Sequence, residues 1–194
     1  MSASEPAIRA SYAKTVIASM KHGPASERDD MFSRLDPTLR LSIREASLLD
    51  WMPARDFAVL PTLVFEVLGA ARAKVFWRAN LLASLERTLL SPLRLGAIAL
   101  YGESPGSLMR MAPQAWQLVS RHCGKCSSGE MTSVSFNLQL KQLPPELQTP
   151  GMLMLWSGGT ESCIERMKFN GHADAELSPG EPSTATIHAA WKSR

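Results

Sequence analysis

The stretch Ser120–Glu130, SRHCGKCSSGE, holds the residue types of this chain that most readily do chemistry. Cys123 and Cys126 have the Cys-x-x-Cys spacing of zinc sites and thiol–disulfide enzymes, and His122 adjoins them. Three interpretations follow: a metal ligand set, a redox pair, or the end of a helix followed by a turn.

The two chemical interpretations need features that the rest of the sequence does not supply. Zinc would require further ligands, for which Cys163 with His172 or His188 are the candidates, but no second closely spaced pair is present. A redox pair normally places its reactive cysteine at the start of a helix, which lowers the thiol pKa. Here Cys123 and Cys126 follow an apolar helical pattern, so a redox role is also the weaker interpretation.

The structural interpretation places a helix end in this stretch. Arg121 and His122 would lie in the last turn, where positive charge is favourable, and Gly124 would supply the left-handed residue that follows it. Cys123 would then pack as a small apolar side chain. We favour this interpretation over metal or redox work.

Arg78 is the second candidate for chemistry. It shares an apolar stripe with Leu82 on a predicted helix over about residues 70–90. An inward guanidinium can bind a ligand carboxylate or phosphate through two hydrogen bonds. The alternative, which we favour, is a structural ion pair with Glu66 or Glu86, or a side chain that extends its charged end to water.

Tryptophans and methionines are frequent in the apolar segments, with 5 Trp and 10 Met in the chain. They predict either an ordinary core or an adaptable apolar cavity. The candidate pocket residues are Trp77, Arg78, Leu82, Trp116 and Trp156. We find no nucleophile elbow, phosphate loop or His-Glu-x-x-His motif, so we expect a non-enzymatic protein.

Composition limits the class of protein. The 194 residues are 45% hydrophobic and 20% charged, which predicts one globular domain over residues 1–194. We expect no signal peptide, no membrane span and, from three cysteines of odd count, reduced thiols in the cytoplasm. The net charge of +3 is dispersed, so nucleic acid is not an expected partner.

Residues 1–124 are predicted to be mainly helical. Apolar residues recur at helical spacing, and Asp36-Pro37, Ser91-Pro92 and Ser104-Pro105 are typical helix starts. Pro61 is expected to kink or interrupt a helix. No strand is expected in the first 120 residues.

The period changes from about 3.6 to 2 after Gly124. Alternation predicts strands around residues 133–141, 166–177 and 184–192, and the loop SPGEPS indicates an antiparallel hairpin. Residues 152–156 are interpreted as part of a buried helix. We therefore predict an α+β fold: an N-terminal helical layer packed on a C-terminal antiparallel sheet of about four strands, with residues 125–194 mainly strands and one helix.

Four segments carry a resemblance to known proteins: DWMPARDFAVLPTLVFEVLG, FWRANLLASLERTLLSPLRL, SPGSLMRMAPQAWQLVSRHCG and IHAAW. The chain resembles an uncharacterised myxobacterial paralogous family, itself similar to the superfamily of haem-NO-binding domains, 4-vinyl-reductase-like domains and TRAPP vesicle-tethering subunits. The resemblance implies an α/β sandwich with an apolar cavity between helices and an antiparallel sheet. It also implies a homodimer through helices and a role in sensing or scaffolding.

Residues of the superfamily's branches transfer poorly to this sequence. The haem-binding branch carries a Tyr-x-Ser-x-Arg element and a proximal His on an earlier helix, and His22 and His122 do not occupy that place. We therefore expect no cofactor, with haem considered and disfavoured. No cysteine here aligns with the acylated cysteine of the vesicle-tethering branch.

Three functional hypotheses result. The first is a non-enzymatic regulatory or sensory module, a homodimer, that binds a small apolar or amphipathic ligand or a protein partner. The second is a zinc or thiol-redox protein working through Cys123, Cys126 and Cys163. The third is a structural interaction subunit without a ligand.

Overall fold

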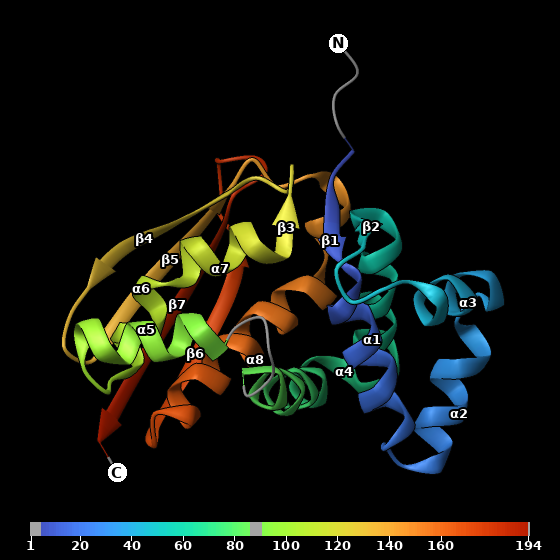
Figure 1. Cartoon of the computed structure of the whole chain (residues 1–194), viewed down its shortest axis with the longest axis horizontal. Coiled ribbons are helices and arrows are strands. Elements are labelled where there is room, and N and C mark those ends of the chain that lie inside the picture. The colour runs from blue at the N-terminus through green and yellow to red at the C-terminus, as the bar shows by residue number, and fades with distance from the viewer. Residues whose placement is uncertain (1–4, 86–90, 194) are drawn as a thin grey trace.

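The computed structural model describes residues 5–85 and 91–193 and combines helices with a four-stranded and a three-stranded sheet (Figure 1). The elements up to residue 101 are β1 (Ala7–Arg9), α1 (Ala10–Lys21), α2 (Ala25–Arg34), α3 (Pro37–Glu45), β2 (Trp51–Pro53), α4 (Ala54–Leu85) and α5 (Ser91–Tyr101). The later elements are α6 (Pro105–Arg110), α7 (Ala112–Val119), β3 (Ser120–Arg121), β4 (Lys125–Met131), β5 (Ser135–Lys141), the 3-10 turn η1 (Pro145–Leu147), α8 (Pro150–Arg166), β6 (Phe169–Leu177) and β7 (Ala185–Ser193).

Helix starts follow the capping signals of the sequence. The Asp36 carboxylate accepts hydrogen bonds from the backbone N–H groups of Thr38, at 2.6 Å, and Leu39, at 3.3 Å. These bonds lower the pKa of the Asp36 carboxyl, because they stabilise its charged form. Ser104 caps α6 in the same way through the N–H of Ser107. The predicted starts at these two positions are confirmed.

The break in α4 lies at Gly69 and not at Pro61. Gly69 has φ 71° and ψ 167°, which divides the helix into arms over residues 54–68 and 70–85. A left-handed φ of this kind favours glycine, whereas Pro61 is accommodated inside the first arm. The expectation that Pro61 would interrupt the helix is therefore wrong.

The larger sheet is antiparallel in the order β4-β5-β7-β6, as the alternation after Gly124 predicts. Phe136, Leu138 and Ile187 point to the buried face, while Asn137 and His188 point to the other face and hydrogen-bond each other at 2.9 Å. The predicted helix across residues 152–156 is confirmed as part of α8. The α+β prediction is thereby confirmed.

Three short strands contradict two details of the prediction. β1 pairs antiparallel with β2 and with β3, so strands do occur in the first 120 residues. Strands of three residues or fewer cannot display alternation, which is why the pattern missed them. α7 ends at Val119 and Ser120 pairs with Ile8 in β3, so the helix end expected at residues 121–124 is wrong, although Gly124 does have φ 86°.

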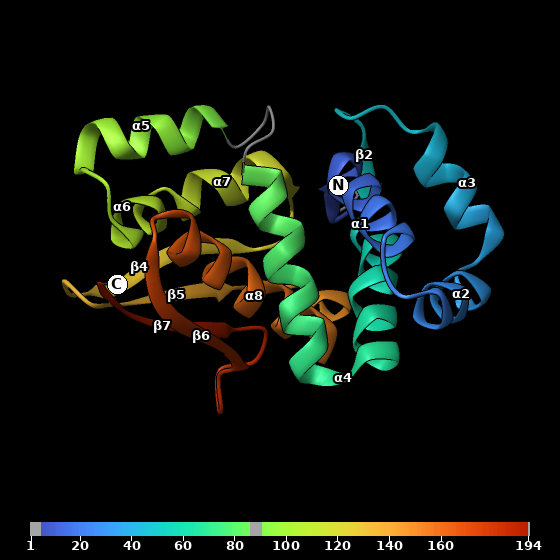
Figure 2. The ribbon, with the colours of Figure 1, turned by 90° about the horizontal axis from the view of Figure 1, so that it is seen from below.

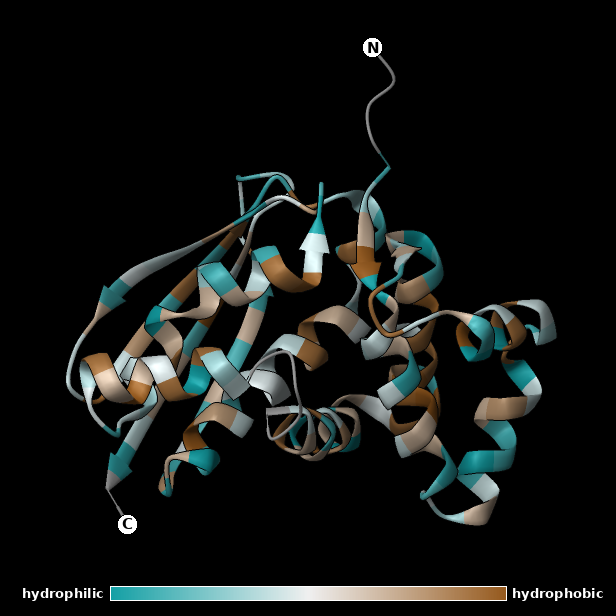
Figure 3. Cartoon of the chain, in the orientation of Figure 1, coloured by the Kyte–Doolittle hydropathy of each residue, from teal (hydrophilic) through white to brown (hydrophobic). Residues whose placement is uncertain are grey.

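The helices form two groups on either side of α4. α1, α2 and α3 lie on one side, and the four-stranded sheet with α5, α6 and α7 lies on the other (Figures 1 and 2). Figure 3 shows hydrophobic segments where α1 and α4 meet, whereas α2 is mainly hydrophilic. One buried cluster joins side chains of α1 and α4 with those of β5 and β7. No described helix has the length and apolarity that crossing a membrane requires.

The packing of α8 on α4 depends on glycine. A Cβ atom at Gly158 would stand 2.4 Å from the Lys74 carbonyl oxygen and 2.8 Å from the Trp77 Cβ. A Cβ at Gly151, one heptad earlier, would stand 2.3 Å from the Pro61 carbonyl oxygen. Because these neighbours are backbone atoms and a Cβ, the two helices could not approach this closely with larger residues.

We predict that Gly158→Ala lowers the free energy of unfolding by about 1–3 kcal/mol, as expected for overpacking against backbone. The control is Gly96→Ala on α5, where a Cβ meets nothing within 4 Å. That change should stabilise the protein by about 0.5–1 kcal/mol because alanine favours a helix interior. Urea denaturation measures both, and equal stability of the two variants would contradict the close approach of α4 and α8.

Candidate functional site

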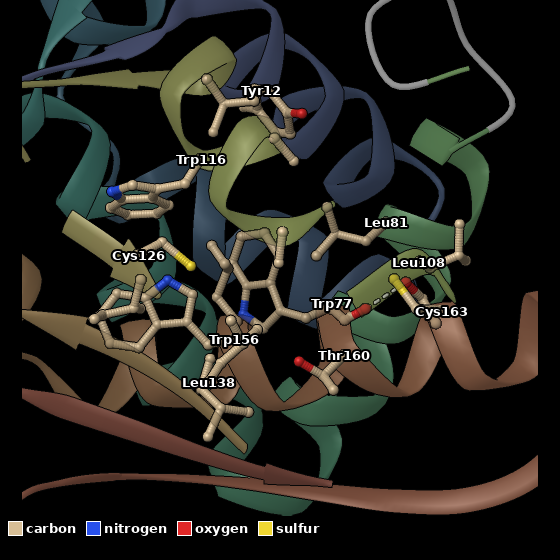
Figure 4. A pocket seen from close by; sticks show the side chains of 18 of the residues that line it. Tyr12, Trp77, Leu81, Leu108, Trp116, Cys126, Leu138, Trp156, Thr160 and Cys163 are labelled. Carbon is tan, nitrogen blue, oxygen red and sulfur yellow. Dashed lines mark hydrogen bonds between the residues drawn. The ribbon is translucent and has the colours of Figure 1, made fainter. Parts of the chain in front are cut away.

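An apolar cavity of about 230 Å³ lies where α1, α4 and α8 meet the α5–α7 group and the inner face of the sheet. Figure 4 shows Trp77 in its middle, with Trp116, Trp156 and Cys126 on one side of the view. This volume lies just below the roughly 300–1,000 Å³ of pockets for drug-sized molecules. The cavity therefore suits a small molecule.

Three tryptophans form much of the wall. Trp77 is 1% exposed, and Trp116 and Trp156 meet edge to face with ring centroids 6.5 Å apart. The indole Nε1–H groups of all three are buried and have no hydrogen-bond partner in the described part of the chain. A buried donor left without a partner costs about 1–3 kcal/mol, so three of them around one cavity call for an explanation.

Few other polar groups reach the lining. Asn80 from α4 donates its side-chain amide to Ser19 Oγ at 2.7 Å and to the Thr15 carbonyl at 3.3 Å. Burial raises the pKa of the Tyr12 phenol, which therefore stays protonated. Arg94 of α5 is the single charged residue among the described lining residues, and its buried Nε–H has no partner.

Two of the three cysteines line the cavity. Burial raises the pKa of the Cys126 thiol to about 12 and that of Cys163 to about 11. Cys123 lies outside the lining, with its Sγ 3.4 Å from the Ala7 carbonyl and 3.3 Å from the Arg121 carbonyl, and burial raises its pKa to about 11 as well. All three thiols are therefore protonated at neutral pH.

The cysteines are not gathered into a metal site. Across residues 5–85 and 91–193, no three His, Cys, Asp or Glu side chains stand close enough together to hold a metal ion. The Cys123, Cys126 and Cys163 set proposed for zinc is thus divided between the cavity wall and a separate buried position.

The candidate pocket residues are divided in the same way. Trp77, Trp116 and Trp156 lie in the lining, whereas Arg78 and Leu82 do not. The Arg78 guanidinium lies 3.4 Å from the Glu165 carboxylate and 3.9 Å from that of Glu161, both on α8. The ion pair expected for Arg78 is thus formed with these partners and not with Glu66, and Glu86 lies outside the described residues.

Glu161 is the centre of an ion network that ties α8 to α4 and β6. Its carboxylate lies 2.9 Å from Lys74 Nζ and accepts the N–H of Ala173 at 3.2 Å. Burial lowers the pKa of Lys74, but hydrogen bonds to Glu161 and Asp174 outweigh it and raise the pKa overall. The network fixes the same helix crossing that Gly158 permits.

Sequence reasoning missed Arg94 and Tyr12. Arg94 stands between Leu93 and Leu95 in an almost wholly apolar helix, which is the same signal that drew attention to Arg78. A charged residue among apolar ones is thus visible in the sequence, but the sequence does not say which element packs on the face of α5 that carries Arg94. Only the packed fold identifies Arg94 as a cavity residue.

Comparison with known proteins shows the fold and nothing more specific. No protein-family model and no curated protein sequence matches the chain. The Fe(II) unliganded H-NOX protein from K. algicida has a TM-score of 0.65 at 8% identity, over 96% of this chain and 98% of that one. An H-NOX structure from work on heme distortion in that family has a TM-score of 0.61 at 9% identity, over 95% of each chain.

A trafficking protein particle complex subunit 3 from Naegleria fowleri, covalently bound to palmitic acid, is also similar. Its TM-score is 0.47 at 9% identity, over 72% of this chain and 95% of that chain. The fold that the resemblance implied is confirmed by the H-NOX structures, so the chain has an H-NOX-like fold.

The expectation of no cofactor, with haem disfavoured, needs correction. It rested on missing motifs, and the fold is one in which haem proteins have been solved, so missing motifs do not exclude haem. The described residues do not fit ligation by imidazole, because His22, His122, His172 and His188 are all exposed and outside the lining. The iron ligand types that the cavity does offer are the thiols of Cys126 and Cys163 and the phenol of Tyr12.

We predict that the native thiols react slowly with iodoacetamide at pH 7.5. The thiolate is the reactive form, and pKa values of about 11 to 12 leave little of it. Labelling, followed by mass spectrometry, should be roughly 100-fold slower than in urea, where the pKa values return to about 8.5. Rapid labelling of native Cys126 would instead support the thiol-redox interpretation.

We predict that Arg78→Ala lowers the free energy of unfolding by less than about 1 kcal/mol. The reason is that the side chains of Arg78 and its partner Glu165 are 43% and 41% exposed, so solvent screens their interaction. Lys74→Met is the comparison, because Lys74 is 20% exposed and leaves a Glu161 carboxylate that is only 12% exposed. Its loss should reach about 1–3 kcal/mol in the same urea titration. A larger loss for Arg78→Ala would show that the surface pair is the stronger one.

Proposed function

We propose that this chain is a non-enzymatic sensory or regulatory module that binds a small, largely apolar molecule in the cavity. Trp77, Trp116 and Trp156 are the proposed contacts, as the sequence led us to expect. The observation that carries the proposal is the cavity itself: an apolar space whose wall holds three buried indole N–H groups without partners. A bound molecule would fill the void and accept hydrogen bonds from those groups.

The position of the cavity supports a sensory role. Its wall is shared by α1, α4 and α8, by the α5–α7 group and by β4, β5 and β7. A molecule bound there would contact each of these elements, so it would stabilise one arrangement of them over others. An H-NOX-like fold over 95–96% of the chain accords with a module that binds a ligand.

Several finer points belong to the same proposal. We infer that residues 1–194 act as one unit, that the protein is a homodimer and that it resides in the cytoplasm. Leu95, Leu100 and Tyr101 on α5 are 57%, 71% and 51% exposed, which accords with a helix that a second copy covers. Light scattering on the purified protein measures the oligomeric state, and a protein partner remains the alternative occupant of that surface.

Native mass spectrometry of freshly purified protein is the direct test. We expect each chain to carry one small organic molecule, which denaturation releases for identification. An absorption spectrum of the same sample shows whether haem is present. A strong haem band would show that haem, and not an apolar molecule, is the ligand. The proposal would be contradicted if the protein carried neither and also failed to bind apolar probes.

We predict that Ala115→Phe weakens binding of the released molecule at least tenfold, because Ala115 of α7 lines the cavity and a benzyl group would occupy part of it. Ala99→Phe is the control, since Ala99 is exposed on α5 and outside the lining. Calorimetric titration measures binding, and the melting temperature checks folding. Equal affinity of the two variants would place the ligand elsewhere.

A further inference from the structure

The fully buried polar atoms of the lining that have no partner within the described residues are all hydrogen-bond donors. They are the Nε1–H groups of Trp77, Trp116 and Trp156 and the Nε–H of Arg94. Indole and guanidinium groups have no acceptor atoms, so none of these four can satisfy another. A molecule that pairs with them must present acceptors.

Arg94 also gives the cavity its charge. It is the single lining residue with a formal charge in the part of the chain that the structure describes, and no ion pair of Arg94 is recorded there. A guanidinium is always protonated, and burying part of it without a carboxylate is costly. The charge therefore favours an anion and opposes a cation.

A half-buried arginine often extends its charged end to water while the inner part of its side chain stays buried. Arg94 Nε exposes less than 1 Å² and accompanies Leu93 into the lining. Of the three guanidinium nitrogens, Nε is the one that is buried without a partner in the described residues. The inner N–H of Arg94 is thus a desolvated donor on a residue that lines the cavity.

The other lining residues determine the size and polarity of the rest of the ligand. Leu81, Leu108, Met109 and Met152 surround the space with apolar surface, and the Asn80 side-chain N–H groups already donate to Ser19 and Thr15. One charge, an apolar wall and a volume of about 230 Å³ suit a short chain or ring with a single polar end. A carboxylate is the common organic group that is anionic and purely an acceptor at neutral pH.

We propose that the cavity selects an apolar monocarboxylic acid and that Arg94 is the residue that binds its carboxylate. This inference rests on the proposed function, because it names the chemical class of the molecule that the cavity takes. It assigns Arg94 a role in selectivity: the acid binds more tightly than a neutral or cationic molecule of the same shape. The indole N–H groups are further donors for the polar end of the ligand.

The test compares three probes of equal chain length, octanoate, octan-1-ol and octylamine, by calorimetric titration at pH 7.4. In the wild-type protein we expect octanoate to bind about tenfold to a hundredfold more tightly than octan-1-ol, the range expected for one charge-assisted hydrogen bond. Octylamine should bind more weakly than the alcohol. Preference for the alcohol or the amine would overturn the inference.

Arg94→Met retains an apolar stem and removes the charge and the N–H donors. We expect it to lose at least tenfold in affinity for octanoate while octan-1-ol changes by less than about threefold. Arg110→Met is the matched control, because Arg110 is exposed on α6, lies over the Tyr101 ring and is outside the lining. It should leave all three affinities unchanged, which excludes a general effect of net charge.

The outcomes separate this inference from the function on which it rests. If octan-1-ol and octanoate bind equally and Arg94→Met changes neither, the cavity binds apolar molecules but the acid preference is wrong. If no probe binds the wild-type protein, both the proposed function and the acid preference fail. Arg94→Gln serves where Arg94→Met does not fold, as judged by circular dichroism, and the same losses are expected of it.

Discussion

The close contact between α8 and α4 is the constraint on which the rest of this structure depends. Gly158 and Gly151 bring the backbone of α8 against Lys74, Trp77 and Pro61 of α4, at distances that no Cβ would permit. Because helix pairs this close slide little, the contact fixes the walls that each helix contributes to the cavity. Glu161 and Lys74 then fix the register of the same pair through their ion contact.

The cavity follows from what this contact leaves unfilled. α4 supplies Trp77, α8 supplies Trp156 and α7 supplies Trp116, so the wall of the cavity is shared between the helix pair and the α5–α7 group. Flexible side chains such as Met109 and Met152 line the remaining space and can adapt to its occupant. A fixed helix pair combined with adaptable lining side chains is a physical basis for binding that changes the arrangement of the surrounding elements.

The sequence predicts the fold because the signals for its helices and strands are local. Helical periodicity, the caps at Asp36 and Ser104 and the alternation after Gly124 each act within a few residues, and each is confirmed. The errors occur where the decisive neighbour is remote. β1 and β3 exist because Ile8 meets Ser120, which lies far away in the sequence.

The same distinction separates the two arginines and decides the chemistry of the site. Arg78 and Arg94 both occupy apolar helices, but Arg78 meets Glu165 of α8, while Arg94 of α5 lines the cavity and has no ion pair recorded within the described residues. An H-NOX-like fold supplies a cavity and leaves its chemistry to the side chains that line it. Iron held by Cys126 or Cys163 would require that thiol to lose its proton, whereas a carboxylate at Arg94 leaves both thiols protonated. The protonation state of the cavity thiols in the loaded protein therefore distinguishes these two occupants of one fold, independently of the absorption of haem.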